Sequence, residues 1–225
     1  MALILNIETS TTVCSVCLAK DETIIDYRED KSGNSHAKIL TVFIDELFKS
    51  NSVSLSELDA VAVSAGPGSY TGLRIGVSVA KGLCYALNKP LISVPTLLAL
   101  ANGIQQKQNV SDAYYMPVID ARRMDAYTAI YNSNLTEVMK ITCATIDNEF
   151  EKSLQAFEKI IIGGNASTKC KSVLIADKFS YAEEINCDSR SMIRISNKKY
   201  LKSEFENTAY FEPFYLKEFP AQIKH

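Results

Sequence analysis

The chain has 225 residues, of which 47% are hydrophobic and 22% charged, and its formal net charge is −2. This length is enough for one large domain or two small ones with real hydrophobic cores, and the composition excludes a disordered chain. The slight negative charge argues against a protein that binds nucleic acid by itself, because neutralising phosphates requires an excess of lysine and arginine. Any contact with RNA is therefore expected to be shared with another protein.

The N-terminal segment begins with three short runs of β-forming residues. They cover 3–7, 13–18 and 23–27 and are separated by polar turns, which is the pattern of an antiparallel meander. The first run is short, has no basic residues before it and is followed by Glu8, so neither a signal peptide nor a membrane anchor is predicted. We expect a cytoplasmic protein.

The six cysteines are scattered through segments that read as strands and helices of a full-sized core, so reduced thiols are expected. Cys14 and Cys17 resemble a redox or metal motif. Because side chains alternate along a strand, positions 14 and 17 are predicted to point to opposite faces, and core packing is the preferred interpretation.

Strands and helices alternate after the meander. Asn34 or Ser35 is expected to cap a helix that ends near Lys49 and carries an unusually wide apolar stripe. Further strands are predicted at 59–64 and 91–94 and further helices at 71–87 and from Pro95, an alternation that implies parallel pairing.

The second half of the chain repeats this pattern. Strands are predicted at 114–119, 126–131 and 159–162, and a helix is expected to begin at Asn165; residues 179–205 show only weak periodicity. We therefore expect an α/β protein with a first lobe at 1–109 and a smaller second lobe at 110–225, whose last helix returns to the first lobe.

A glycine-rich loop at 64–76 leads from a predicted strand into a predicted helix. Gly66, Gly68 and Gly72 permit positive φ angles and let backbone N–H groups approach an anion, to which the helix N-terminus adds partial positive charge. Two interpretations remain open: a site for phosphate or an acidic group, or a tight strand-to-helix turn. No lysine of the Walker type follows Gly72.

A cleft is predicted beside this loop. The turn from Glu8 to Thr12 follows the first strand, where ligands of open α/β sheets collect, although a hydroxyl-rich turn with an exposed carboxylate is the alternative. A second glycine turn at 163–166 is expected to close the cleft from the other lobe. The predicted phosphate or nucleotide site comprises Glu8, Thr9, Ser10, Gly66, Gly68, Ser69, Gly163 and Gly164.

Five segments in order resemble the bacterial TsaB (YeaZ-like) family. They are NIETS at 6–10, GPGSYTGLRIG at 66–76, DARR at 120–123, GGNA at 163–166 and PFYLK at 213–217. The resemblance implies the actin, sugar-kinase and Hsp70-like (ASKHA) fold, with two lobes that each hold a mixed sheet flanked by helices. It also implies a partner or activator of the TsaD-type transferase that makes threonylcarbamoyladenosine on tRNA, beside the anticodon.

The resemblance further implies the following partners and cofactors. The partners are a TsaD-like homologous subunit and an ATP-binding TsaE-type third subunit, with tRNA contacted jointly and a homodimer formed when the partner is absent. No cofactor is expected for this chain, and ATP or ADP is expected only at the level of the complex.

Histidine content argues against a catalytic role. The TsaD-type sibling binds a metal through a His-x-x-x-His pair, whereas this chain has only His36 and His225, and the residue four positions after His36 is Leu40. We therefore predict neither a metal site nor a catalytic residue. Related chains carry an older label as glycoproteases. Without a histidine pair this chain lacks the metal ligands of a metalloprotease, so we do not expect that activity.

One alternative function remains, an independent nucleotide-hydrolysing or phosphotransfer enzyme of the same fold that would use Glu8 as its carboxylate. Arg122 and Arg123 either contact an anion or face solvent. Five basic residues either help to hold tRNA or form a solvated face: Arg190, Arg194, Lys198, Lys199 and Lys202.

The predicted helix at 71–87 has two apolar faces. One face is expected to cover the sheet, and the opposite one requires another cover, either a neighbouring helix of the same chain or a partner subunit. With the stripe of the preceding helix it gives a predicted partner interface of Ile39, Phe43, Leu47, Ile75, Val79, Gly82 and Ala86.

Overall fold

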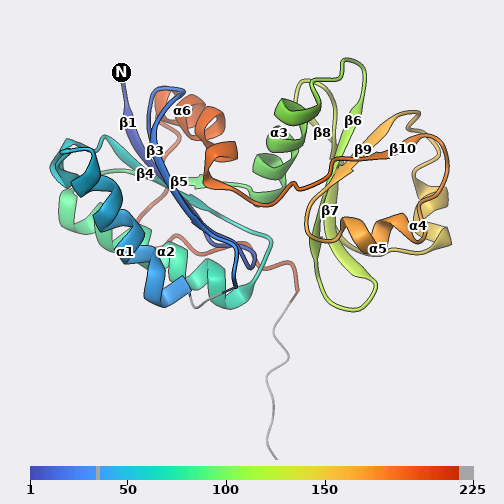
Figure 1. The fold of residues 1–225 in the computed structure, drawn as a ribbon, viewed down its shortest axis with the longest axis horizontal. Coiled ribbons are helices and arrows are strands. Elements are labelled where there is room, and N and C mark those ends of the chain that lie inside the picture. The colour runs from blue at the N-terminus through green and yellow to red at the C-terminus, as the bar shows by residue number, and fades with distance from the viewer. Residues whose placement is uncertain (34–35, 218–225) are drawn as a thin grey trace, which may run out of the picture.

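The computed structural model describes residues 1–33 and 36–217, which fold around two five-stranded sheets that lie side by side (Figure 1). The predicted two-sheet α/β architecture is confirmed. The expected cap at Asn34 or Ser35 falls outside the described residues. No helix in the described part of the chain is long and apolar enough to cross a membrane.

The first sheet has the strand order β3-β2-β1-β4-β5. Strands β1 (Leu3–Glu8), β2 (Cys14–Lys20) and β3 (Thr23–Asp30) form the predicted antiparallel meander. Strands β4 (Ala60–Ser64) and β5 (Leu91–Val94) then add in parallel beside β1, as the alternation with helices predicts.

Helices cover both faces of the first sheet. Helices α1 (His36–Ser50) and α2 (Tyr70–Leu87) pack on one face, and α6 (Ile193–Leu201) packs on the other against β5 and β1. A short helix, η1 (Leu55–Glu57), links α1 to β4. Cys14 and Cys17 belong to the cores on opposite faces, as predicted, and burial raises the pKa of each thiol to about 12.

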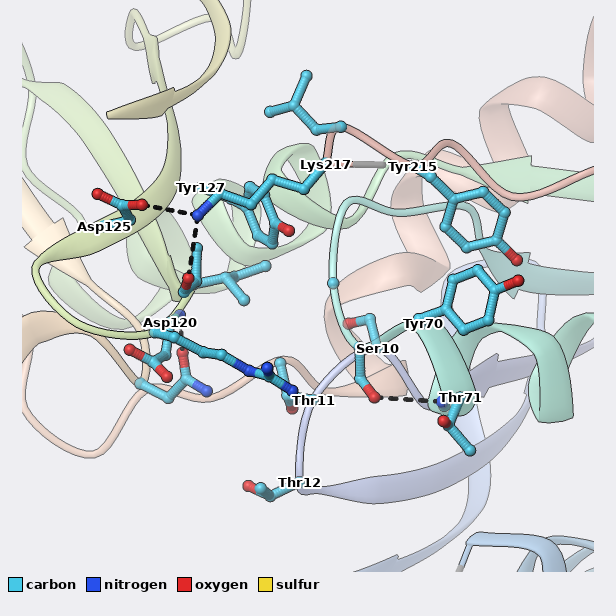
Figure 2. A pocket seen from close by; sticks show the side chains of 18 of the residues that line it. Ser10, Thr11, Thr12, Tyr70, Thr71, Asp120, Asp125, Tyr127, Tyr215 and Lys217 are labelled. Atoms are coloured by element: carbon cyan, nitrogen blue, oxygen red, sulfur yellow. Dashed lines mark hydrogen bonds and ion pairs between the residues drawn. The ribbon is translucent and has the colours of Figure 1, made fainter. Parts of the chain in front are cut away.

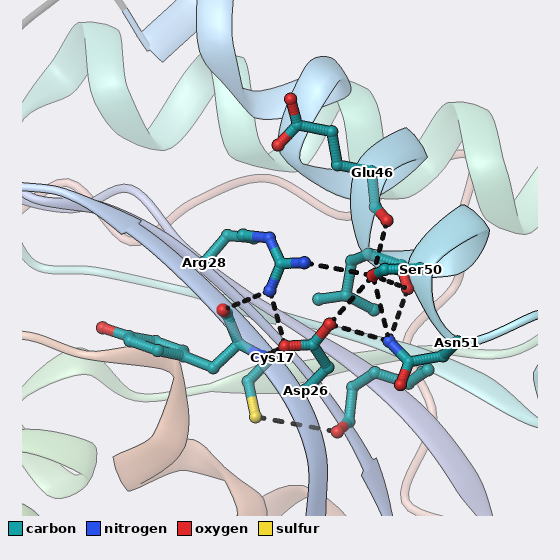
Figure 3. Close-up of polar contacts among 9 residues, drawn as sticks. Cys17, Asp26, Arg28, Glu46, Ser50 and Asn51 are labelled. Carbon is teal, nitrogen blue, oxygen red and sulfur yellow. Dashed lines mark hydrogen bonds and ion pairs between the residues drawn. The ribbon is translucent and has the colours of Figure 1, made fainter.

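A polar cluster fixes the end of α1 to strand β3 (Figure 3). The Asp26 carboxylate accepts hydrogen bonds from Arg28 (2.5 Å), Ser50 Oγ (3.0 Å) and Asn51 Nδ2 (2.7 Å). Burial opposes the ionisation of Asp26, but these hydrogen bonds and one from the Tyr27 backbone outweigh it and lower its pKa to about 2. The cluster therefore sets which side of α1 faces outward.

The second sheet has the order β10-β9-β6-β7-β8. The predicted strands at 114–119 and 126–131 agree within one residue with β6 (Tyr114–Asp120) and β7 (Asp125–Tyr131). The third strand, β8 (Glu137–Thr145), was not predicted at all. Strands β9 (Ile160–Gly163) and β10 (Phe179–Tyr181) pair in parallel on the other side of β6.

Helix α3 (Thr96–Gln108) enters the second lobe from β5 and packs on one face of the second sheet. Pro95 is its N-cap residue rather than part of its first turn. The short helices α4 (Asn148–Ser153) and α5 (Ser167–Lys171) flank the opposite face, and η2 (Ser189–Met192) leads back to α6. Helix α5 begins two residues after the predicted start at Asn165.

Candidate functional site

A cleft of about 1080 Å³ lies between the two lobes (Figure 2). The first lobe contributes the β1–β2 turn and the first turns of α1 and α2, and the second lobe contributes the β6–β7 turn and Asn165. The end of the described chain, at Tyr215, Leu216 and Lys217, completes the wall. The cleft therefore collects polar groups from segments that are distant in sequence.

The glycine-rich loop packs tightly against the β1–β2 turn. A Cβ atom at Gly68 would lie 2.4 Å from the Ser10 carbonyl oxygen, and one at Gly72 would lie 2.1 Å from that of Thr9. The Ser69 N–H donates to the Ser10 carbonyl (2.7 Å), and Thr9 Oγ1 donates to the Gly72 carbonyl (2.8 Å). Close backbone packing in a strand-to-helix turn thus accounts for Gly68 and Gly72.

Only part of the predicted phosphate site faces the cleft. Ser10, Gly68 and Ser69 line it, whereas Glu8, Thr9 and Gly66 lie buried behind its wall. Gly163 and Gly164 are not among the lining residues: a Cβ atom at Gly163 would meet Ile104, and one at Gly164 would meet the Val118 carbonyl oxygen. Asn165 takes their place in the wall, and its Oδ1 accepts from the Asp120 N–H (2.9 Å).

Glu8 is fully buried, so the alternative of an exposed carboxylate is wrong. Its Oε1 accepts a hydrogen bond from the Ser10 N–H (2.6 Å), and its Oε2 has no partner among the described residues. Burial raises the pKa of Glu8 and outweighs the hydrogen bonds from Ser10, which lower it. The protonated form of this carboxyl is therefore favoured relative to an exposed glutamate.

The second-lobe wall is the β6–β7 turn. Its carboxylates are paired, Asp120 with Lys169 and Asp125 with Lys217. Arg122 and Arg123 are exposed in the cleft wall, and their backbone φ angles are 71° and 47°. Neither guanidinium forms an ion pair with another described residue. The turn therefore presents two cations to the cleft.

The sole histidine of the described chain also lies at the cleft. His36 begins α1, and its Nε2 lies 2.7 Å from the Thr11 carbonyl oxygen. Its Nδ1 is buried without a partner among the described residues. This contact joins α1 to the β1–β2 turn and gives His36 a place in the architecture of the wall.

The outer face of α2 is incompletely covered. Leu73, Val77, Ala80 and Cys84 are buried on the sheet side. On the opposite side Ile75 and Val79 are half-buried against the core of the first lobe, while Gly82 and Ala86 are exposed. Ile39 and Phe43 of α1 are also half-buried.

Leu47 is a correction to the predicted interface, because it is fully buried in the core of the first lobe. It occupies the same helical row as Ile39 and Phe43, but it lies in the last turn of α1, next to Ser50 and Asn51, which are hydrogen-bonded to Asp26 of β3. We call the remaining six residues the α2 face: Ile39, Phe43, Ile75, Val79, Gly82 and Ala86.

The basic cluster near α6 is partly engaged within the chain. Lys199 donates to the Ser93 carbonyl oxygen (2.8 Å), and Arg190 pairs with Asp188 and stacks 4.0 Å from the centre of the Tyr27 ring. Arg194 lies instead beside a second, smaller cavity between α3 and the β7–β8 connection. The five residues therefore do not act as one free patch.

Sequence reasoning missed the contribution of the chain end to the cleft. Tyr215, Leu216 and Lys217 line the cavity, although the sequence singled out their segment only as part of a family motif. No periodic pattern marks them, so the motif was the only signal that could have identified them.

Comparisons with known proteins agree with this architecture. The family model of TsaD, tRNA N6-adenosine threonylcarbamoyltransferase, matches residues 30–210. The chain is 34% identical over 128 residues to the Escherichia coli tRNA threonylcarbamoyladenosine biosynthesis protein TsaB, covering 57% of this chain and 54% of that protein. It is 30% identical over 171 residues to TsaB of Buchnera aphidicola subsp. Baizongia pistaciae, covering 74% and 76%. The matched region thus spans about half the length of the Escherichia coli relative.

Solved structures show the same fold. YeaZ from Pseudomonas aeruginosa superposes with a TM-score of 0.81 at 22% identity, covering 96% of this chain and all of that one. The polyphosphate/ATP-glucomannokinase of an Arthrobacter strain gives a TM-score of 0.51 at 10% identity, covering 90% and 100%. The second similarity shows that the two lobes share the fold of ASKHA-like sugar kinases, so the predicted fold class is confirmed. Because the chain is 30% identical to a TsaB protein and covers 76% of its length, the chain belongs to the TsaB (YeaZ-like) family.

Proposed function

We propose that this chain is a non-catalytic partner of a TsaD-type transferase and takes part in making threonylcarbamoyladenosine on tRNA. The names of its relatives support the pathway. The observation that carries the partner role is the α2 face, and within it the surroundings of Gly82.

Gly82 lies in the interior of the 18-residue helix α2, and a Cβ atom there would meet no other heavy atom within 4 Å. Glycine inside a helix costs about 1 kcal/mol relative to alanine. Gly72 and Gly76 of the same helix are different, because a Cβ atom at either would lie 2.1 or 2.2 Å from an oxygen atom of Thr9. Packing within the chain explains Gly72 and Gly76 but leaves Gly82 unexplained.

A second helix that approaches α2 closely would account for Gly82. Small residues at 82 and 86 let two helix backbones come close, and the half-buried Ile75 and Val79 supply apolar surface for the contact. A homologous TsaD-like subunit would present a matching helix pair. In its absence a second copy of this chain would occupy the same face and form a homodimer.

Association with a purified TsaD-type subunit, measured by sedimentation velocity, tests the proposal. Val79→Asp is expected to weaken binding about tenfold or more, since it places a charge in a desolvated contact, and to lower the melting temperature by only about 2–4 °C, because Val79 is half-buried in the isolated chain. Val138→Asp is the matched control, because Val138 is 44% exposed on β8 in the other lobe. A Val79→Asp chain that binds normally but melts early would assign this face to the core and remove the proposal.

A non-catalytic role also fits the position of Glu8. The alternative, a nucleotide-hydrolysing or phosphotransfer enzyme, requires a carboxylate in the cleft to handle Mg²⁺, and Glu8 is buried behind the wall. We expect no phosphate release from ATP by the isolated chain, with ATP or ADP acting only in the complex with a TsaE-type subunit. Turnover that Glu8→Ala abolishes would favour the enzyme instead.

Joint recognition of tRNA completes the proposal. The net charge of −2 and the internal engagement of Lys199 and Arg190 argue against strong RNA binding by this chain alone. We therefore expect tRNA to bind the assembled complex much more tightly than the isolated chain, which filter binding at fixed salt measures directly.

A further inference from the structure

After α6, which already packs on the first lobe, residues 202–217 continue along that lobe as a segment that we call the strap. The Glu206 N–H donates to the Leu91 carbonyl oxygen (2.9 Å), and Phe211 packs against the core beneath α2. Lys81 of α2 donates to the carbonyl oxygens of Ala209 (2.9 Å) and Phe211 (3.2 Å). These contacts deliver the following residues to the cleft.

The strap is then anchored beside the glycine-rich loop. The Phe214 N–H donates to the Ala65 carbonyl (2.7 Å), and the Tyr215 ring lies 4.8 Å from that of Tyr70, at the start of α2. The Arg74 guanidinium lies 4.3 Å from the centre of the Tyr70 ring. The two rings are tilted by 42° and in contact, and a cation lies over one of them, so apolar and cation–π contacts attach this end of the strap to the first lobe.

Two residues later the strap reaches the second lobe. The Lys217 ammonium forms an ion pair with Asp125 (2.6 Å) and donates to the Ala121 carbonyl oxygen (3.2 Å). Figure 2 shows both anchors, with Tyr215 over Tyr70 on one side of the cleft and Lys217 directed to Asp125 on the other. Two residues of chain span at most about 7 Å, so the two anchors lie close together along the chain.

We propose that residues 213–217 form an interlobe clasp, which holds the two lobes at a fixed separation and limits access to the cleft between them. The covalent crossings at α3 and η2 join the lobes elsewhere, and the clasp adds a non-covalent connection at the wall of the cleft. Its second-lobe anchor is the releasable one, because the Lys217 and Asp125 side chains are 43% and 31% exposed and are screened by salt. This inference does not depend on the proposed function.

Hydrogen–deuterium exchange tests the clasp if each anchor is removed and the opposite lobe is observed. Lys217→Met should raise the opening of the first-lobe loop at 66–72 about two- to five-fold, the size expected from a partly exposed ion pair. Tyr215→Ala should likewise loosen the second-lobe turn at 121–127. Because either loss releases the strap, the double variant should open the lobes no further than the more open single variant.

Lys171→Met is the matched control. Lys171 is also 43% exposed and pairs with Glu183, but both residues belong to the second lobe, so exchange at 66–72 should stay at the wild-type rate. In 1 M NaCl the wild type should approach the Lys217→Met chain. The clasp is refuted if Lys217→Met changes exchange only at 121–127, or if the two single effects add in the double variant.

Discussion

The two lobes share one strand topology but differ in their helices. In each sheet the first strand is central, the next two form an antiparallel meander on one side, and the last two pair in parallel on the other. The helices of the outer face are α1 and α2, of 15 and 18 residues, in the first lobe, and α4 and α5, of six and five residues, in the second. The same strand order, a meander followed by two parallel strands, is therefore compatible with outer helices of very different lengths. Among the outer-face helices of the described chain, only those of the first lobe are longer than two turns.

The carboxyl groups that end the two central strands have also diverged. Glu8 ends β1 and is fully buried; its Oε1 accepts a hydrogen bond from the Ser10 N–H, and the nearby charge of Asp188 adds to the effect of burial on its pKa. Asp120 ends β6 in the open, paired with Lys169. The same topological position thus holds a carboxyl sealed inside one lobe and an ion pair at the surface of the other.

The glycine that follows the fourth strand of each sheet offers the strongest test of the shared topology. Gly66 and Gly164 have φ angles of 100° and 129°, and a Cβ atom would lie 2.4 Å from the Phe214 carbonyl oxygen or 2.1 Å from that of Val118. We expect Gly66→Ala and Gly164→Ala each to lower the free energy of unfolding by about 2–3 kcal/mol, measured by urea denaturation. Gly33→Ala, at φ 76° with no atom within 4 Å, should cost less, and equal losses at all three positions would contradict the steric argument.

Glu8→Gln should sharpen the contrast between the two carboxyl groups. Because the pKa of Glu8 is raised in the folded state, the folded chain retains a proton that the unfolded chain has lost above the ordinary value of 4.5. Stability should therefore fall with rising pH, by at most about 1.4 kcal/mol per unit, until the raised pKa is passed. Denaturation between pH 5 and 8 should show a smaller fall for Glu8→Gln than for the wild type. Parallel curves would mean that Glu8 ionises normally in the folded state.

The smallest expected effect is that of Gly82→Ala, which separates the stability of the isolated chain from its affinity for a partner. Gly82→Ala should stabilise the isolated chain by about 1 kcal/mol, since the new methyl group has open space and alanine favours the helix. The same change should weaken binding to a TsaD-type subunit in sedimentation experiments, because the partner helix can no longer approach as closely. Gly76→Ala, whose Cβ would meet Thr9 Oγ1 at 2.2 Å, should instead destabilise the chain. A Gly82→Ala variant that is more stable and binds normally would leave the glycine without a role at the interface.

Periodicity predicted most of the fold because most elements bury a regular apolar row. Strand β5 was predicted without error, and α2 and β6 within a residue. Strand β8 was missed although Met139, Ile141 and Cys143 alternate along it, because each is only half-buried and polar residues stand between them. Helix α6 lies in a segment whose apolar residues are too few to give a clear period.

The site was harder to predict because it depends on contacts between distant segments. Turn chemistry favoured an exposed Glu8, whereas the folded chain buries it fully, and burial in a fold depends on segments that turn chemistry does not include. The helical rows of α1 gave no reason to expect that Leu47 is more buried than Phe43, because the burial of a helix residue depends on tertiary packing. The clasp rests on contacts between distant segments: Lys217 and Asp125, for example, are 92 residues apart in the sequence. No local sequence pattern encodes such contacts.

The route of the chain through α3 and η2 makes the second lobe a continuous insertion between two parts of the first. Helix α3 already belongs to the second core, and its Asn102 Nδ2 donates to the Ser191 carbonyl oxygen (2.8 Å), so the entry and exit of the insertion touch. A domain whose two ends meet can be excised and replaced by a short linker. The first lobe, with α1, α2 and α6, is thus a natural starting point for a minimal single-domain binder.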